Sequence, residues 1–382
     1  MATKTILILG GGIGGIVTAR ELRRHLGHEH RIIIVDKNPV HSFAPSYLWL
    51  VIGWRQPEAI ERSLSLLDHH QIEFHQGIIT EILLQEKKVK TDSETIAYDY
   101  LIIALGAELD WTMNPALGDA NLSFYTKTDS LILREKISSF TGGTIAIVIA
   151  SVPYTFPPAP YEAAFLLESF FAQRNVKNIK INIFSPDIAP FHFAGSTISQ
   201  TFSRLIAEHG IEVYSSHQIR SIDKNNRRIN FTNSSSHQYD LLICTPPHRP
   251  PKVIAKTGIT DQSGWIAINK MMQTPVPNVF AIGDVASLRK ENGERLPMTG
   301  VFTLNQAEIV AFNIAHEIQK NNLRKEFTGS GFLIVELGHG RACNIHGDFL
   351  AVPPPELTFN EPNVTIHWGK VVIEKYWLWR WF

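Results

Sequence analysis

The amino-acid sequence predicts an α/β protein built on doubly wound parallel sheets. Short apolar runs of strand length alternate with segments that carry apolar residues at helical spacing. The pattern begins at Ile6 and begins again at Thr144, so the chain reads as two similar halves. Its 382 residues are enough for two or three domains.

The first strand, turn and helix lie near the N-terminus. Ile6–Leu9 is an apolar run, Gly10–Gly15 is rich in glycine, and apolar residues then recur at helical spacing in Ile16–Leu26. A second apolar run, Arg31–Val35, ends at Asp36. Two strands joined by a helix form a βαβ unit, and this unit requires a parallel sheet.

The rest of the chain continues the alternation. Strands are predicted at Ile72–His75, Tyr100–Ala104, Thr144–Ala150, Ile179–Phe184, Ile211–Tyr214, Asp240–Cys244 and Val279–Ile282, and helices at Tyr161–Gln173 and Thr197–His209. The polar runs Glu86–Tyr98 and Ser221–Gln238 predict small antiparallel excursions or hairpins.

Composition excludes several classes of protein. Lys plus Arg and Asp plus Glu both number 36, which excludes a strongly basic nucleic-acid binder, and 44% hydrophobic residues exclude a disordered chain. Cys244 and Cys343 have no metal-ligand spacing, so we expect no metal site, no disulfide scaffold and a reducing compartment. No leader precedes Ile6, and no apolar stretch reaches the length of a spanning helix, so we expect a cytoplasmic protein.

The glycine-rich turn predicts dinucleotide binding. Gly10, Gly12 and Gly15 have G-x-G-x-x-G spacing between a strand and a helix, and Asp36 ends the next strand. The first glycine allows a sharp turn, the second lets the backbone approach a pyrophosphate, and the third lets helix and strand pack closely. Asp36 would accept a hydrogen bond from a ribose hydroxyl. The alternative is a purely structural turn.

Two further motifs carry a resemblance to the flavoproteins that have two dinucleotide domains. One is Tyr98–Gly106, a strand that ends in Ala-x-Gly, and the other is Asn278–Ala286, which contains Gly283 and Asp284. The resemblance implies that Asp284 touches the ribityl or pyrophosphate part of FAD, and that FAD is the cofactor. The alternative for Asp284 is an N-cap at the end of a buried strand.

The second half of the chain lacks the expected second glycine turn. Thr144–Ala150 is followed by Ser151–Pro160, which holds four prolines. Proline has no N–H to offer a phosphate. The next strand ends in Ser185 instead of an acidic ribose partner. NAD(P)H is therefore disfavoured as the electron donor.

Longer segments resemble sulfide:quinone oxidoreductases and the flavin subunit of flavocytochrome c sulfide dehydrogenases. They are Pro157–Glu162, the segment Leu296–Gly300 that would cover the flavin ring, and the closing Trp368–Leu378. The resemblance implies two Rossmann-like domains, FAD, a cofactor contact at Gly300 and delivery of electrons to a membrane quinone. It also implies a sulfide or small thiol-type donor.

The cysteine set departs from that family. Phe156 stands where sulfide-oxidising members carry a cysteine, and no cysteine occurs in the segment 121–126. Cys343 matches the remaining redox cysteine, but one thiol cannot hold a sulfur chain between two. A thiolate of lowered pKa at Cys343 could still attack the flavin ring or an incoming sulfur. A small buried hydrophobe is the other interpretation, for Cys343 and for Cys244.

Three more residues are candidates for the site. Glu162 begins a helical run, where it serves either as an acid or base near the flavin or as a carboxylate that complements the helix dipole. His192 follows a strand of the second half, where the family places a polar residue near the sulfide route; the alternative is a surface histidine. Met298 stands where the family often has lysine beside the flavin, and loss of that charge would destabilise an anionic reduced flavin.

The C-terminal residues predict a helix that lies on a membrane. Four of the eight tryptophans fall between Trp368 and Phe382, with Lys370, Lys375 and Arg380 among them. In helical projection one face carries Trp368, Val371, Val372, Tyr376 and Trp379. Such a face suits the headgroup boundary. The alternative is a terminal helix docked on its own domain or on a second subunit.

These observations together predict an FAD-binding domain at residues 1–106 and 265–325, a second Rossmann-like domain at 107–264, and a flavin-covering and membrane-docking segment at 326–382. The function implied is transfer of two electrons from a sulfide or thiol-type donor through FAD to a quinone, on a peripheral, monotopic protein. The alternatives are a single-subunit NADH:quinone oxidoreductase, a flavin-binding protein with decayed catalysis, and a periplasmic flavocytochrome subunit. A homo-oligomer is left open.

Overall fold

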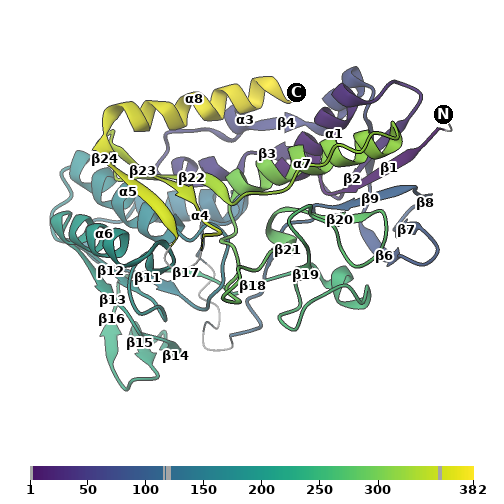
Figure 1. Cartoon of the computed structure of the whole chain (residues 1–382). Helices are drawn as coiled ribbons and strands as arrows, with labels where there is room; N and C mark the ends of the chain where they lie inside the picture. The colour runs from purple at the N-terminus through teal and green to yellow at the C-terminus, as the bar shows by residue number, and fades with distance from the viewer. Residues whose placement is uncertain (1–2, 115–116, 118–121, 352–354) are drawn as a thin grey trace.

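The structure is a computed structural model that describes residues 3–114, 117, 122–351 and 355–382. Two parallel sheets carry the two halves of the chain, and the C-terminal helix runs across the top of the molecule in the view of Figure 1. The duplicated α/β pattern of the sequence is therefore present in the fold.

The first sheet consists of five parallel strands. Their order is β20 (Val279–Ala281), β9 (Tyr100–Ile103), β1 (Thr5–Leu9), β2 (Arg31–Asp36) and β5 (Glu73–Gln76). The strands are apolar on both faces because both faces are covered. One face packs against α1 (Ile13–His25) and α7 (Gly300–Ile318). The other packs against the antiparallel strands β6 (Ile79–Leu83), β7 (Lys88–Thr91) and β8 (Thr95–Ala97).

The second sheet repeats this plan with four parallel strands. Their order is β13 (Ile211–Tyr214), β12 (Ile179–Phe184), β11 (Gly143–Ile149) and β17 (Leu241–Thr245). Helices α5 (Ala159–Gln173) and α6 (Ser196–Glu208) cover one face. The antiparallel strands β14 (Ile219–Asp223), β15 (Arg228–Phe231) and β16 (Ser236–Gln238) cover the other. The hairpins expected from the two polar runs are thus confirmed.

A small antiparallel sheet and a long helix complete the chain. Strands β22 (Ser330–Glu336), β23 (Ala342–Asp348) and β24 (Glu356–Asn363) lead directly into α8 (Val364–Arg380). The helix begins four residues before Trp368, because the Asn363 side chain accepts a hydrogen bond from the Ile366 N–H at 2.8 Å and caps it.

Short elements connect these layers. The helices are α2 (Tyr47–Val51), α3 (Pro57–Ile60) and α4 (Lys127–Ser138), and the paired strands are β3 (Val40–Ser42) with β4 (Glu61–Ser63), β10 (Glu108–Leu109) with β18 (His248–Arg249), and β19 (Ile266–Ala267) with β21 (Ala286–Ser287). Among the described residues, no helix is both long enough and apolar enough to cross a bilayer.

Every strand and helix expected in the chain-wide alternation is present; most ends shift by at most two residues, and α1 begins at Ile13, three residues before Ile16. For example, β20 ends at Ala281 because Gly283 turns the chain with a φ of 72°. The domain boundaries inferred from the sequence stay a prediction.

Candidate functional site

The glycine turn after β1 has the tight geometry that its spacing predicts. Gly10 has a φ of 108°, and a Cβ there would collide with the Ala104 carbonyl oxygen. A Cβ on Gly15 would collide with the Gly10 carbonyl oxygen. A Cβ on Gly12, by contrast, would meet no atom within 4 Å. The turn therefore packs closely on its inner side and is open beside Gly12.

The N-terminus of α1 suits an anionic group. Gly12 is the N-cap residue, and the helix has no side-chain cap and no acidic residue in its first turn. Backbone N–H groups at a helix N-terminus bind phosphate well because they lack partners and carry the positive end of the helix dipole. The open side of the turn at Gly12 thus fits a pyrophosphate.

Asp36 lies beside this turn at the end of β2. Its carboxylate accepts hydrogen bonds from the Gly11 N–H at 2.6 Å and from the Asn38 N–H at 2.8 Å. A carboxylate offers about four lone-pair sites, so capacity for a ribose hydroxyl remains. This placement agrees with the ribose-binding role predicted for Asp36, which stays a prediction.

Two further glycine positions lie at the same ends of neighbouring strands. Gly106, after β9, has a φ of 67° and open space where a Cβ would stand. Gly283, after β20, has a φ of 72° and donates its N–H to the Gln306 side-chain oxygen at 2.8 Å. Because the carboxyl ends of parallel strands meet at one edge of a sheet, both turns lie on the edge that carries the Gly10–Gly15 turn.

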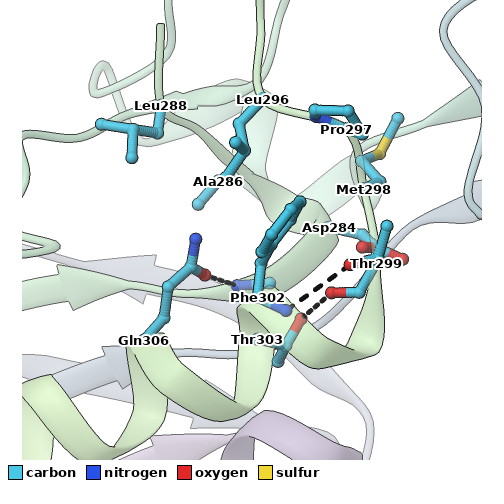
Figure 2. A pocket seen from close by; sticks show the side chains of 11 residues that line it. Asp284, Ala286, Leu288, Leu296, Pro297, Met298, Thr299, Phe302, Thr303 and Gln306 are labelled. Carbon is cyan, nitrogen blue, oxygen red and sulfur yellow. Dashed lines mark hydrogen bonds between the residues drawn. The ribbon is translucent and has the colours of Figure 1, made fainter. Parts of the chain in front are cut away.

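A hollow opens at the N-terminus of α7, next to Gly283. Figure 2 shows the segment Leu296–Met298 on one side of it and Phe302, Thr303 and Gln306 of the helix on the other. Thr299 caps the helix, and a Cβ on Gly300 would stand 3.2 Å from Ile13 of α1. The N-termini of α1 and α7 therefore lie side by side, and both face this part of the site.

Asp284 is half-buried in the wall of that hollow. Burial raises its pKa to about 6, against the opposing charge of Arg295 and a hydrogen bond with Thr155. The Arg295 guanidinium donates to the Asp284 carbonyl oxygen at 2.8 Å, and burial lowers its own pKa to about 10. A carboxyl group held between Thr155 and the charge of Arg295 is suited to accept a hydrogen bond from a polyhydroxyl chain.

The proline-rich loop after β11 lies against the same region. Phe156 has a φ of 51° and donates its N–H to the buried Met298 carbonyl oxygen at 2.8 Å. The Tyr154 hydroxyl donates to the Pro157 carbonyl oxygen at 3.1 Å. The loop thus uses its polar groups internally and on the segment Leu296–Gly300, instead of presenting a row of N–H groups to a phosphate.

Aromatic residues occupy the two places where the resemblance leads us to expect further cysteines. Phe124 is buried and packs on Tyr125, with ring centroids 4.9 Å apart, and Phe156 packs against the main core. Burial raises the pKa of the Tyr125 hydroxyl. Asn121, the first residue of the segment 121–126, lies outside the described residues.

A buried charged cluster joins the second half of the chain to its C-terminal helix. Glu162 of α5 accepts from the Lys370 ammonium of α8 at 2.5 Å and from the Glu336 N–H at 3.4 Å. The Glu336 carboxylate in turn bonds the His367 ring at 2.9 Å. Glu162 and Glu336 are 1% and 0% exposed, so Lys370 and His367 are the partners that make their burial tolerable.

The same cluster determines the state of Glu162. Burial raises the pKa of its carboxyl group, the charge of Lys370 opposes that rise, and the charge of Glu336 adds to it. Glu162 is therefore a carboxyl group that keeps its proton to higher pH than an ordinary glutamate does, as a buried proton acceptor or donor would.

Cys343 lies next to this cluster, but its environment differs from the one we expected. The side chain is fully buried in β23. Burial, followed by the charge of Glu162, raises the pKa of the thiol. The expectation of a lowered thiol pKa is therefore wrong for this structure, because a buried neighbour of a carboxylate is stabilised as the neutral thiol. Cys244, also buried, has its pKa raised to about 12 by burial.

His192 lies apart from that cluster. It begins a 3-10 helix after β12, its side chain is 45% exposed, and its ring stands 3.6 Å from the Asp187 carboxylate. Among the described residues no contact joins it to Glu162 or Cys343. The structure places Cys343 beside Glu162 and leaves His192 at the surface of the second half, and the catalytic roles of all three stay predictions.

Helix α8 buries several polar residues together with part of its apolar residues, and it exposes a second set of apolar residues on its outward face. Besides His367 and Lys370, Glu374 is buried and accepts from the Ser46 hydroxyl at 2.5 Å and the Arg55 guanidinium at 2.9 Å. The outward face exposes Val364, Trp368, Val372, Ile373, Tyr376 and Trp379. The expected apolar face is present, with Val371 only half-buried at its edge. Lys370, expected at a headgroup boundary, points inward because Glu162 needs a counter-charge.

Sequence reasoning did not find Glu336, His367, Arg55 or Glu374. Their signal in the sequence is weak. Polar residues at every third or fourth position of an otherwise apolar helix fit a solvent-exposed polar face as well as they fit a row of charged residues that points into the protein. The partners that distinguish the two cases come from segments more than thirty residues away.

Comparison with known proteins gives three matches of interest. The family described as Pyridine nucleotide-disulphide oxidoreductase matches residues 4–307. A sulfide-quinone reductase of Aquifex aeolicus is 26% identical over 398 residues, which cover 99% of this chain and 91% of that protein. The NADH dehydrogenase-like protein YutJ of Bacillus subtilis is 24% identical over 290 residues, which cover 75% of this chain and 77% of that protein.

The X-ray structure of the Aquifex aeolicus sulfide:quinone oxidoreductase matches the fold of the whole chain. The TM-score is 0.88 at 24% identity, and the match covers 99% of this chain and 91% of that one. The predicted α/β fold with two Rossmann-like halves is thereby confirmed, and so is the resemblance to this group of flavoproteins.

Proposed function

Because the chain belongs to the pyridine nucleotide-disulphide oxidoreductase family, we propose that it passes two electrons from a sulfide or thiol-type donor to a membrane quinone. The protein is an FAD-dependent oxidoreductase. The observation that carries the finer proposal is the contrast between its halves: a glycine turn open beside Gly12 in the first, and the loop of residues 151–160 with its prolines in the second.

The residues of the first half would hold FAD as follows. The N–H groups at the start of α1 would bind the pyrophosphate, Asp36 would accept from the ribose, and Asp284 would accept from the ribityl chain. Gly106, Gly283 and Gly300 would let the backbone approach the coenzyme closely. When bound, FAD supplies the two-electron chemistry, and the chain positions and insulates it.

The proposed reaction releases protons, and the buried cluster of Glu162 and Lys370 contains a group that would accept one. Two thiols that join as a disulfide release two electrons and two protons, and a quinone takes up two of each to become a quinol. Glu162 would accept one of those protons at its carboxylate, with Lys370 holding the group in place. Cys343 is the remaining thiol near this acid: as its sulfur joins the sulfur of an incoming sulfide or thiol, Glu162 would take up the Cys343 proton, and FAD, when bound, would supply the acceptor for the two electrons released.

The outward face of α8 supports docking on a membrane surface. Trp368 is 59% exposed and Trp379 is 73% exposed, on a helix whose inward residues Lys370 and Glu374 have partners inside the protein. Tryptophan at this density favours the headgroup boundary. In this proposal the protein is peripheral, its body lies in the cytoplasm, and the quinone reaches it from the bilayer. The oligomeric state stays open.

Anaerobic reduction of the flavin tests the proposal. The purified yellow protein is mixed separately with sulfide, a small thiol and NADH, and the visible absorption of the flavin is followed before a soluble quinone is added. We expect sulfide or the thiol to bleach the flavin and the quinone to restore its colour. Faster bleaching by NADH would replace the proposal with the NADH:quinone alternative, which the match to an NADH dehydrogenase-like protein favours. Failure of all three would favour a flavin-binding protein that has lost catalysis.

A further inference from the structure

We propose that His41 positions the glycine turn for FAD and links that turn to the C-terminal helix. His41 lies in the short strand β3 and is 5% exposed. Its Nδ1 atom stands 3.0 Å from the carbonyl oxygen of Gly11, inside the turn. On its other side the ring packs against Trp377 of α8, with centroids 4.7 Å apart.

The hydrogen bond from His41 has only one possible direction. A carbonyl oxygen can only accept, so Nδ1 carries the hydrogen. Burial lowers the pKa of His41 to about 4, so the ring is neutral at physiological pH and Nε2 is a bare acceptor. Nε2 is buried and has no hydrogen-bond partner among the described residues. Leaving such an atom unpaired costs on the order of 1–3 kcal/mol, a cost that a leucine at this position would avoid.

The bond to Gly11 controls the orientation of a peptide group that faces the coenzyme. In a planar trans peptide the C=O and the following N–H point in opposite directions. The Gly11 carbonyl points toward His41, so the Gly12 N–H of the same peptide points away from β3. On the other side of Gly11, its own N–H is bound by Asp36. Both peptides that flank Gly11 are therefore fixed, which favours a preformed anion site over a flexible glycine loop.

Trp377 holds the histidine ring in place from α8. Trp377 is 3% exposed and also packs on Phe43, with ring centroids 5.1 Å apart. One turn earlier, Glu374 is tied to Ser46 and Arg55, on the chain that follows β3. The end of α8 thus packs on and hydrogen-bonds to the residues around β3, and His41 of β3 hydrogen-bonds to the turn Gly10–Gly15. Linkage requires that FAD binding then stabilise the docked helix by as much as the docked helix strengthens FAD binding.

Two substitutions at His41 separate this role from simple packing. Asparagine places its Nδ2 donor where histidine has Nδ1, whereas leucine fills the space and offers no donor. We expect His41→Leu to weaken FAD binding about tenfold and His41→Asn to stay within about threefold of the parent. The readout is the dissociation constant for FAD, from the fluorescence of flavin released on dilution of the holoprotein. If His41 served only for packing, His41→Leu would bind FAD more tightly than His41→Asn, because leucine leaves no buried nitrogen unpaired. Tighter binding by His41→Leu would overturn the proposal.

The link to α8 is tested on the helix itself. We expect Trp377→Leu to weaken FAD binding about threefold, while Trp379→Leu, on the exposed face of the same helix, leaves it unchanged. Bound FAD should also slow cleavage by trypsin after Lys375. Equal affinity of the Trp377→Leu variant and the parent would refute the link. Equal rates of cleavage of the parent protein with and without FAD would refute it too. This second measurement needs no His41 variant.

Discussion

Removal of the Lys370 ammonium should destabilise the protein in a way that depends on pH. Lys370→Met keeps the length of the side chain and leaves Glu162 buried without its counter-charge. Breaking a buried ion pair from one side costs about 3–5 kcal/mol of unfolding free energy, because the remaining charge is uncompensated. The variant can avoid part of that cost only if Glu162 takes up a proton.

The direction of the pH dependence follows from the pKa of Glu162. In the folded parent this pKa is already raised above 4.5 by burial, and loss of Lys370 raises it further. A raised folded-state pKa means that the folded protein binds the proton more tightly than the unfolded chain does. Stability from this group is therefore full below about pH 4.5 and is lost as the pH rises through the folded pKa. Each pKa unit by which Glu162 differs between the folded and the unfolded chain changes the free energy of unfolding by about 1.4 kcal/mol.

We therefore expect Lys370→Met to lose little stability at pH 5 and about 3–5 kcal/mol at pH 8, measured by urea unfolding of the holoprotein. The double variant Glu162→Gln/Lys370→Met is the matched control, because it removes both charges. It should recover most of the loss and show a flat pH profile. A loss that is equal at both pH values, or a double variant that is as unstable as Lys370→Met at pH 8, would show that the buried charge of Glu162 does not cause the loss of stability.

Three further predictions concern the coenzyme, the thiol and the membrane. Gly10→Ala should abolish FAD retention, because a Cβ there collides with a backbone carbonyl; a yellow, fully loaded variant would contradict this. Cys343→Ser should slow bleaching by thiol about tenfold or more without changing flavin content; bleaching at the parent rate would remove the thiol from the mechanism. Replacing Trp368 and Trp379 by serine should release the protein from anionic liposomes; unchanged co-sedimentation would defeat docking through α8.

The local parts of the fold could be predicted from the sequence. The turn from Gly10 to Gly15 and its neighbouring strands are specified by residues close in the chain, so spacing alone indicates them. Asp36, Gly106 and Gly283 follow the ends of strands, and parallel strands end at a common edge. The topology alone therefore implies that these residues lie close together.

The buried cluster could not be predicted in the same way. Lys370 reads as a surface cation in a tryptophan-rich helix, and only the packing of α8 on α5 turns it toward Glu162. The direction of the thiol pKa at Cys343 depends on burial and on that same carboxylate, neither of which spacing reveals. His41 has no sequence signal at all, since its role rests on one backbone carbonyl and one ring of α8.

The central claim is that the coenzyme of the first half takes its electrons from a sulfur compound and not from a nicotinamide. The most direct measurement is the ratio of the rates at which sulfide and NADH, at equal concentration and without oxygen, remove the visible colour of the bound flavin. We predict a ratio well above one and the return of the colour when quinone is added. A ratio below one would contradict it.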